Sequence, residues 1–133
     1  MKKHPKAALI SMLLFLFAVN AFAQTPLSVL ENRLSKTWNL KMIEQNGKTT
    51  KPDQGLNDFV LILKQDHSSA QGLNPDGLIM GKWNVNEKEM MLTIKDESMK
   101  QDYKMKIVSL TLTELILEDA TSVTPLKIYY QAK

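Results

Sequence analysis

Asp66, His67 and Ser68 are the one place where an acid, an imidazole and a hydroxyl occur side by side in this chain. Catalytic triads are assembled from distant chain positions so that each group points at the next, whereas adjacent residues in a turn point in different directions. Asp and Ser side chains in a turn usually bond to nearby backbone groups instead. We therefore predict that these three residues form a polar hairpin turn without a catalytic role.

Metal and cofactor chemistry also lack the residues they need. His67 is the sole histidine after Gln24 and the chain has no cysteine, so a transition-metal site would lack its usual ligands. The glycines form no phosphate-binding loop. Glycoside hydrolysis needs two carboxylates that face each other across a cleft, whereas the paired acids fall in polar turns: Asp53 with Asp58, Asp96 with Glu97, and Glu118 with Asp119. We expect no catalytic residue, no metal, no cofactor and no enzymatic activity.

The remaining candidates for a site are apolar. Met42, Met90 and Met105 share the predicted interior faces of their strands with Trp38, Leu92 and Tyr103. Methionine adapts its shape, so it suits either an irregular core or a tolerant ligand pocket. Ordinary core filling is the alternative to a pocket. The predicted ligand-binding residues are Trp38, Met42, Trp83, Met90, Tyr103 and Met105.

The elements that would position these residues follow from hydrophobic spacing. Leucines three and four residues apart predict one short helix over residues 26–35, and period-two alternation predicts strands in the rest of the chain. Lys41, Lys95 and Lys104 should face outward. The side chains expected to face inward are Trp38, Leu40, Met42, Phe59, Leu61, Leu63, Trp83, Leu92, Ile94, Met105, Ile107, Leu115, Leu117 and Ile128.

The connections between these strands decide the fold class. Most are two to five residues long, which makes strands pair in sequence order, whereas a Greek-key sandwich needs a long crossover. We predict an all-β fold: a small up-and-down antiparallel barrel of about eight strands with one short N-terminal helix. Asn46-Gly47 is a typical hairpin turn. The long connection from Lys48 to Asp58, which contains Pro52 and Gly55, would gate a barrel mouth near Trp38 and Trp83.

Three short motifs run along the chain: Leu34-Ser35-Lys36-Thr37-Trp38, then Gly81-Lys82-Trp83, then Tyr103-x-Met105-x-Ile107 followed by Leu115-x-Leu117. They resemble the lipocalin-like domains of small exported bacterial proteins. The first motif is similar to the family's Leu-x-Gly-x-Trp opening, with Lys36 in place of the glycine. The resemblance covers residues 30–130 and implies a barrel with a smaller or shallower cavity than that of a full lipocalin. It implies no particular ligand.

The N-terminus has the pattern of a secretory signal. Lys2, Lys3 and Lys6 precede an apolar stretch over residues 7–19, and the small-residue pattern Ala21-Phe22-Ala23 follows. The apolar stretch is shorter than the ~20 residues of a membrane-spanning helix. We expect a signal peptide over residues 1–23, cleaved between Ala23 and Gln24, and one domain over residues 24–133 in the periplasm or outside the cell.

Charge excludes nucleic acid as a partner. The net charge of +3 comes from the three N-terminal lysines, and the remaining basic and acidic residues are equal in number.

Two functions stay open. One is an exported, non-enzymatic protein that holds a small apolar or amphipathic ligand in a barrel cavity. The other is a protein-interaction or inhibitor module of the cell envelope with a filled barrel, for which the outward-facing member of Tyr129 and Tyr130 could contact a partner. An open cavity of ~300 Å³ or more would favour the first.

Overall fold

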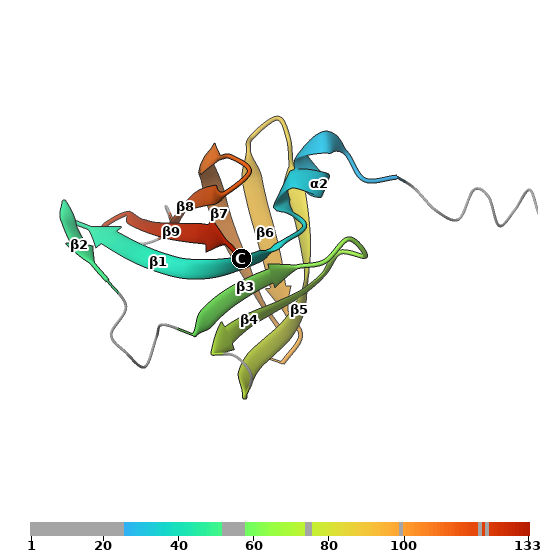
Figure 1. Cartoon of the computed structure of the whole chain (residues 1–133), viewed down its shortest axis with the longest axis horizontal. Helices are drawn as coiled ribbons and strands as arrows, with labels where there is room; N and C mark the ends of the chain where they lie inside the picture. Colours follow the sequence, from blue (N-terminus) through green and yellow to red (C-terminus); the bar gives the residue numbers. More distant parts are fainter. Residues whose placement is uncertain (1–25, 52–57, 74–75, 99, 120, 122) are drawn as a thin grey trace, which may run out of the picture.

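The computed structural model describes residues 26–51, 58–73, 76–98, 100–119, 121 and 123–133. Within these ranges one short helix precedes nine strands (Figure 1). The helix is α2 (Val29–Leu34), and the strands are β1 (Thr37–Gln45), β2 (Lys48–Thr50), β3 (Phe59–Leu63), β4 (Ser68–Leu73), β5 (Gly77–Asn86), β6 (Met91–Asp96), β7 (Gln101–Leu110), β8 (Glu114–Asp119) and β9 (Leu126–Ala132).

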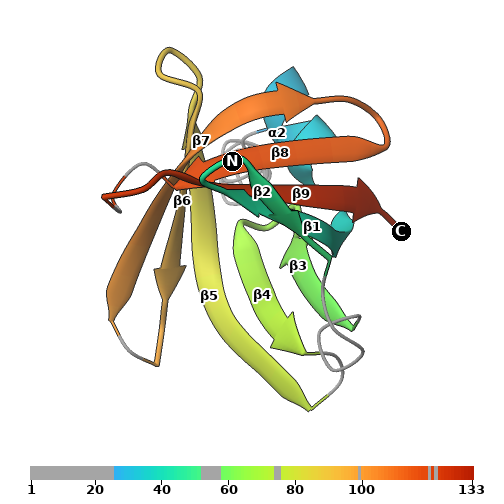
Figure 2. The ribbon, with the colours of Figure 1, turned by 90° about the vertical axis from the view of Figure 1, so that its left-hand side faces the viewer.

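Eight of the strands form a closed antiparallel barrel. From β3 to β9 each strand pairs with the next along the chain, while β1 pairs with β3 on one side and with β9 on the other. Figure 2 shows these strands wrapping around a common interior. The short connections after β3 explain why consecutive strands pair, and the pairing of β1 with β9 closes the barrel. The predicted up-and-down barrel of about eight strands is confirmed.

Helix α2 is shorter than the predicted helix over residues 26–35. Ser28 caps its N-terminus: the Ser28 hydroxyl accepts from the Glu31 N–H at 3.1 Å, and the Glu31 carboxylate accepts from the Ser28 N–H at 3.2 Å. This reciprocal pair satisfies two backbone N–H groups and fixes the first turn after Ser28, so Leu27 stays outside the helix. Within the described ranges, no helix is long and apolar enough to cross a membrane.

The Asn46-Gly47 hairpin turn is confirmed. Both residues adopt left-handed backbone conformations, with φ of 54° and 74°, as a two-residue hairpin requires. The prediction that a loop begins at Lys48 is wrong. Residues Lys48–Thr50 form β2, which pairs with the end of β1. The other residues of the proposed gate, including Pro52 and Gly55, lie outside the described residues.

A bulge in β1 overturns the predicted direction of Met42. Leu40 lies opposite Tyr130, but Met42 lies opposite Tyr129 and Ile43 opposite Ile128, so one extra residue is inserted in β1. A bulge shifts the alternation by one position. From there on Ile43 faces inward with Ile128, whereas Met42 shares the outer face with Tyr129.

The other inward predictions are confirmed. One buried cluster contains most of them together with Leu34 and Tyr130, while Leu40 and Ile128 pack against it and Phe59 lines a cavity: its members are Leu34, Trp38, Leu61, Leu63, Trp83, Leu92, Ile94, Met105, Ile107, Leu115, Leu117 and Tyr130. Lys41, Lys95 and Lys104 are exposed. Tyr129 and Tyr130 face opposite sides, as expected: Tyr130 is buried, and Tyr129 is half-buried on the outer face, where its hydroxyl donates to Glu44 Oε2 at 2.6 Å.

Candidate ligand-binding cavity

Helix α2 closes one end of the barrel. It directly precedes β1, so the chain places it over the end at which β1 begins (Figure 1). Leu34 of the helix is fully buried, and its carbonyl accepts from Trp38 Nε1 at 3.0 Å. Trp83 Nε1 donates to the Lys64 carbonyl at 2.9 Å in the adjacent turn. Both indoles therefore belong to the packed core beneath the helix, with their N–H groups bonded to backbone.

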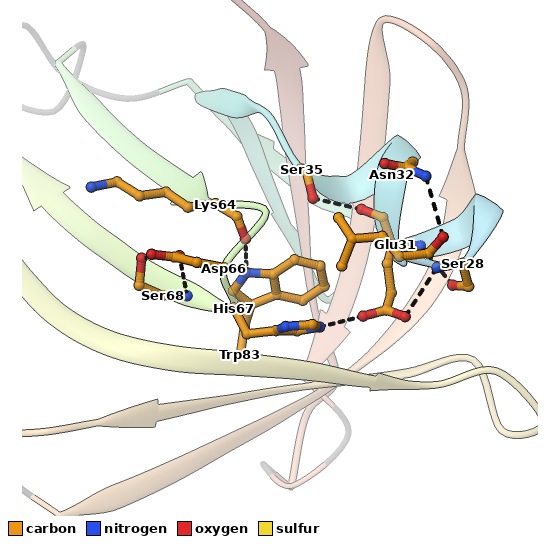
Figure 3. Close-up of polar contacts among 10 residues, drawn as sticks. Ser28, Glu31, Asn32, Ser35, Lys64, Asp66, His67, Ser68 and Trp83 are labelled. Carbon is orange, nitrogen blue, oxygen red and sulfur yellow. Dashed lines mark hydrogen bonds and ion pairs between the residues drawn. The ribbon is translucent and has the colours of Figure 1, made fainter. Parts of the chain in front are cut away.

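The Asp66-His67-Ser68 turn lies at the same end and contributes to the closure. Asp66 Oδ1 accepts from the Ser68 N–H at 2.9 Å and from its hydroxyl at 2.5 Å, and these bonds lower the pKa of Asp66. His67 points away from both: its ring lies 5.1 Å from the Trp83 ring, and its Nε2 bonds the Glu31 carboxylate (Figure 3). The three side chains do not form a relay, so the prediction of a polar turn is confirmed.

A cavity of about 360 Å³ lies toward the opposite end of the barrel. Its walls come from the middle of β1, the first residue of β3 and parts of β4, β5, β7, β8 and β9. Ile79 is 40% exposed, which marks the mouth. The lining residues are Leu40, Ile43, Phe59, Gln71, Ile79, Tyr103, Met105, Asp119, Ile128 and Tyr130. The predicted mouth near Trp38 and Trp83 is therefore wrong, because α2 closes that end.

Two polar groups in the cavity wall differ in their surroundings. Tyr130 is 3% exposed, and within the described chain its hydroxyl has no hydrogen-bond partner. Burial raises the pKa of Tyr130 above its usual range, so the hydroxyl keeps its proton. Asp119 ends β8, where its Oδ1 accepts from the Thr121 hydroxyl at 2.6 Å and from the Thr121 N–H at 3.0 Å. The cavity wall thus contains the neutral hydroxyl of Tyr130 and the carboxylate of Asp119.

The structure brings two of the six predicted ligand-binding residues to the cavity. Tyr103 and Met105 line it from β7. Trp38 and Trp83 lie in the core at the closed end, and Met42 is on the outer face. Met90 adopts φ of 52° before β6 and lines a shallow groove beneath α2 with Leu30.

Most of the cavity residues were missed as ligand-binding residues by the sequence analysis. Leu40, Phe59 and Ile128 were expected to face inward, but nothing in their spacing distinguishes a cavity wall from a packed core. A usable signal was present in the order of the elements: a helix just before β1 covers the end where β1 begins. Because β1 runs away from that end and successive barrel strands alternate in direction, the end of β1 and the start of the next barrel strand lie at the free end. The same alternation applies to the strands that follow.

The described residues contain no cluster of side chains that could hold a metal ion. No set of three or more His, Asp or Glu side chains lies close enough together to hold an ion. The chemistry available at the cavity is therefore packing against apolar walls, hydrogen bonding and charge.

No protein-family model and no curated protein matches the chain by sequence. Solved structures do match. A lipocalin-like protein from Bacteroides uniformis ATCC 8492 has a TM-score of 0.57 and 16% identity over 76% of this chain and 99% of its own. The chain has a lipocalin-like fold. A DUF4847 family protein from Bacteroides vulgatus ATCC 8482 gives 0.56 and 15% over 76% of this chain and 96% of its own. At these identities the likeness of this lipocalin-like chain to both proteins concerns the fold alone.

Proposed function

We propose that this lipocalin-like protein is a non-enzymatic binding protein that holds a small amphipathic molecule in its barrel cavity. One observation carries the proposal: the barrel interior is not filled, but contains a cavity of about 360 Å³ with mainly apolar walls. Ligand pockets typically span about 300 to 1,000 Å³ and combine apolar walls with a few polar groups. The Tyr130 hydroxyl, which has no partner among the described residues, supports an amphipathic rather than a purely apolar ligand because it can bond to a polar head group.

The cavity also separates this function from the alternative, an interaction or inhibitor module with a filled barrel. A filled barrel would leave no volume for a ligand and would place the recognition surface outside. The open volume exceeds the ~300 Å³ that favours a ligand carrier. The binding protein is therefore the better-supported function.

Uptake of octanol tests the proposal. Octanol has an apolar chain for the walls and a hydroxyl for hydrogen bonding, and isothermal titration calorimetry reports its binding without a label. Met105 lines the cavity and is 8% exposed. Met105→Trp should fill part of the cavity and weaken octanol binding about tenfold or more, which corresponds to ~1.4 kcal/mol. Lys95→Ala, on the exposed outer face, should leave binding unchanged.

The stability of each variant must be measured alongside, because overpacking alone can cost ~1 to 3 kcal/mol. Denaturant unfolding separates the two effects. Failure of wild-type protein to bind octanol or an environment-sensitive apolar dye, or unchanged uptake by a folded Met105→Trp variant, would contradict the proposal. The filled-barrel interaction module would then take its place.

We also propose that the protein is exported, with Gln24 as the first residue of the mature chain. The basic start, the apolar stretch and the Ala21-Phe22-Ala23 pattern support this. N-terminal sequencing of protein recovered from the periplasm or the medium should find Gln24 or its cyclised form. Intact Met1 on membrane-bound protein would contradict cleavage and indicate an anchor.

A further inference from the structure

Asp119 gives the cavity a charge that its apolar walls do not share. It is the last residue of β8, and the alternation of that strand places its side chain on the inner face with Leu117. It lines the cavity of about 360 Å³ and also a groove of about 170 Å³ beside it. Glu118, its neighbour, faces outward and pairs across the sheet with Lys106 and Lys127.

The Asp119 carboxylate is ionised, and only one of its two oxygens accepts a hydrogen bond from the described residues. Its Oδ1 accepts both hydrogen bonds from Thr121, and these bonds lower the pKa of Asp119. Among the described residues, no donor reaches its second oxygen, Oδ2. One carboxylate oxygen therefore anchors the turn after β8, while the other remains available to a ligand.

No cation in the described cavity wall offsets this charge. The nine other lining residues are uncharged: six are apolar, and Gln71, Tyr103 and Tyr130 are neutral polar groups. The smaller groove adds Asp102 and Lys104, which cancel each other and leave Asp119 as the net charge. Near apolar walls a charge is screened less than in bulk water, so an anionic head group would be repelled and a cationic one attracted.

We propose that the cavity selects amphipathic molecules with a cationic head group, such as primary alkylamines, over fatty-acid carboxylates. The ammonium would bond Asp119 Oδ2 at the mouth, with the apolar chain along Met105 and Ile128. This inference rests on the proposed function, since it specifies the class of ligand for the same cavity. It distinguishes a carrier of organic amines from a carrier of free fatty acids, which have the same chain chemistry but the opposite charge.

Three probes with the same chain length and different heads test the selectivity: octylamine, octanol and octanoate, titrated at neutral pH by calorimetry. Wild-type protein should bind octylamine about tenfold more tightly than octanoate, with octanol between them. Asp119→Asn keeps an oxygen acceptor for Thr121 and removes the charge, so the tenfold preference for octylamine over octanoate should disappear. Added salt should weaken octylamine binding to wild-type protein and leave octanol binding unchanged.

Glu118→Gln is the matched control. It removes the same charge from the adjacent residue of β8, on the outer face, and should leave all three affinities unchanged. An equal loss in both variants would show a general field effect and would overturn the contact with Asp119. Equal binding of the three probes to wild-type protein would overturn the selectivity and leave the binding function intact. Failure of all three probes to bind would overturn the binding function itself. If Asp119→Asn does not fold, the order of the three wild-type affinities and their salt dependence still test the selectivity for a cationic head group.

Discussion

Lys36 occupies the position at which the lipocalin-like opening motif has glycine. In this structure its ammonium lies 5.5 Å from the centroid of the Trp38 ring, and Nζ donates to the Leu112 carbonyl at 2.7 Å. The lysine thus covers the indole from outside and connects β1 to the turn between β7 and β8. Trp38 remains fully buried, so the exchange of glycine for lysine does not disturb the packing at the closed end.

Gly81 is required by its neighbours rather than by its own backbone angles. A Cβ at this position would lie 2.2 Å from the Lys95 carbonyl oxygen on β6 and 3.0 Å from the Ser69 hydroxyl on β4. The carbonyl belongs to a paired strand and cannot rotate away. Gly81→Ala should therefore lower the free energy of unfolding by about 2 to 3 kcal/mol in a denaturant titration.

Gly77→Ala serves as the control for Gly81→Ala, because its Cβ would meet nothing closer than 3.3 Å. It should cost clearly less than the change at Gly81. Equal stability of the two variants would mean that β4, β5 and β6 are not as close as the structure places them.

At the scale of the elements, the bulge in β1 decides which of two adjacent residues reaches the cavity. Ile43 lines the cavity, while Met42 shares the outer face with Tyr129. Ile43→Lys should place a charged chain in the cavity and weaken octanol binding about tenfold, whereas Met42→Lys should leave binding unchanged. The reverse pattern, measured by calorimetry on folded variants, would mean that the strand continues without a bulge.

The Glu31–His67 contact adds to the apolar packing of helix α2 on the barrel, and its contribution depends on pH. The hydrogen bond from His67 is the main reason that the pKa of Glu31 lies below its usual 4.5. The ionised carboxylate therefore stabilises the folded state above pH 4.5, and this contribution is lost as the pH falls through the lowered value. The contribution is at most about 1 kcal/mol, because both side chains are partly exposed.

Glu31→Gln should accordingly be less stable than wild-type protein near neutral pH, and the difference should shrink as the pH falls below 4.5. Chemical denaturation over a series of pH values measures this difference. Glu87→Gln, which changes an exposed carboxylate in the turn between β5 and β6, provides the comparison. A Glu31→Gln difference that stays constant down to the acid limit would mean that the ionised carboxylate does not hold the helix.

The whole molecule has two unlike ends. The end beneath α2 is filled by both tryptophans, and the other contains the cavity. Octanol in the cavity should therefore leave the emission of Trp38 and Trp83 unchanged, because both indoles are buried away from it. Phe59→Trp should place a reporter in the cavity wall whose emission responds to octanol. A strong change in wild-type emission would place the ligand at the closed end instead.

The sequence by itself determined the strands, the barrel and most inward faces. Alternation decides which side chains of a strand share a face, and short connections decide which strands pair, so both properties are local. The same local chemistry explains the turns at Asn46-Gly47 and Asp66-His67-Ser68. The resemblance to lipocalin-like domains also agrees with the fold that the solved structures show.

Tertiary structure alone decided where the barrel is filled and where it is hollow. Trp38 and Met105 both read as inward-facing side chains in the sequence, but the first lies beneath a helix and the second beside an open volume. A cavity depends on how side chains from several strands fill a common space, and no single strand contains that information. The bulge that exchanges Met42 for Ile43 is likewise set by pairing with β9. Asp119 resembles any other acid in a polar turn until the barrel closes and makes it part of the cavity wall.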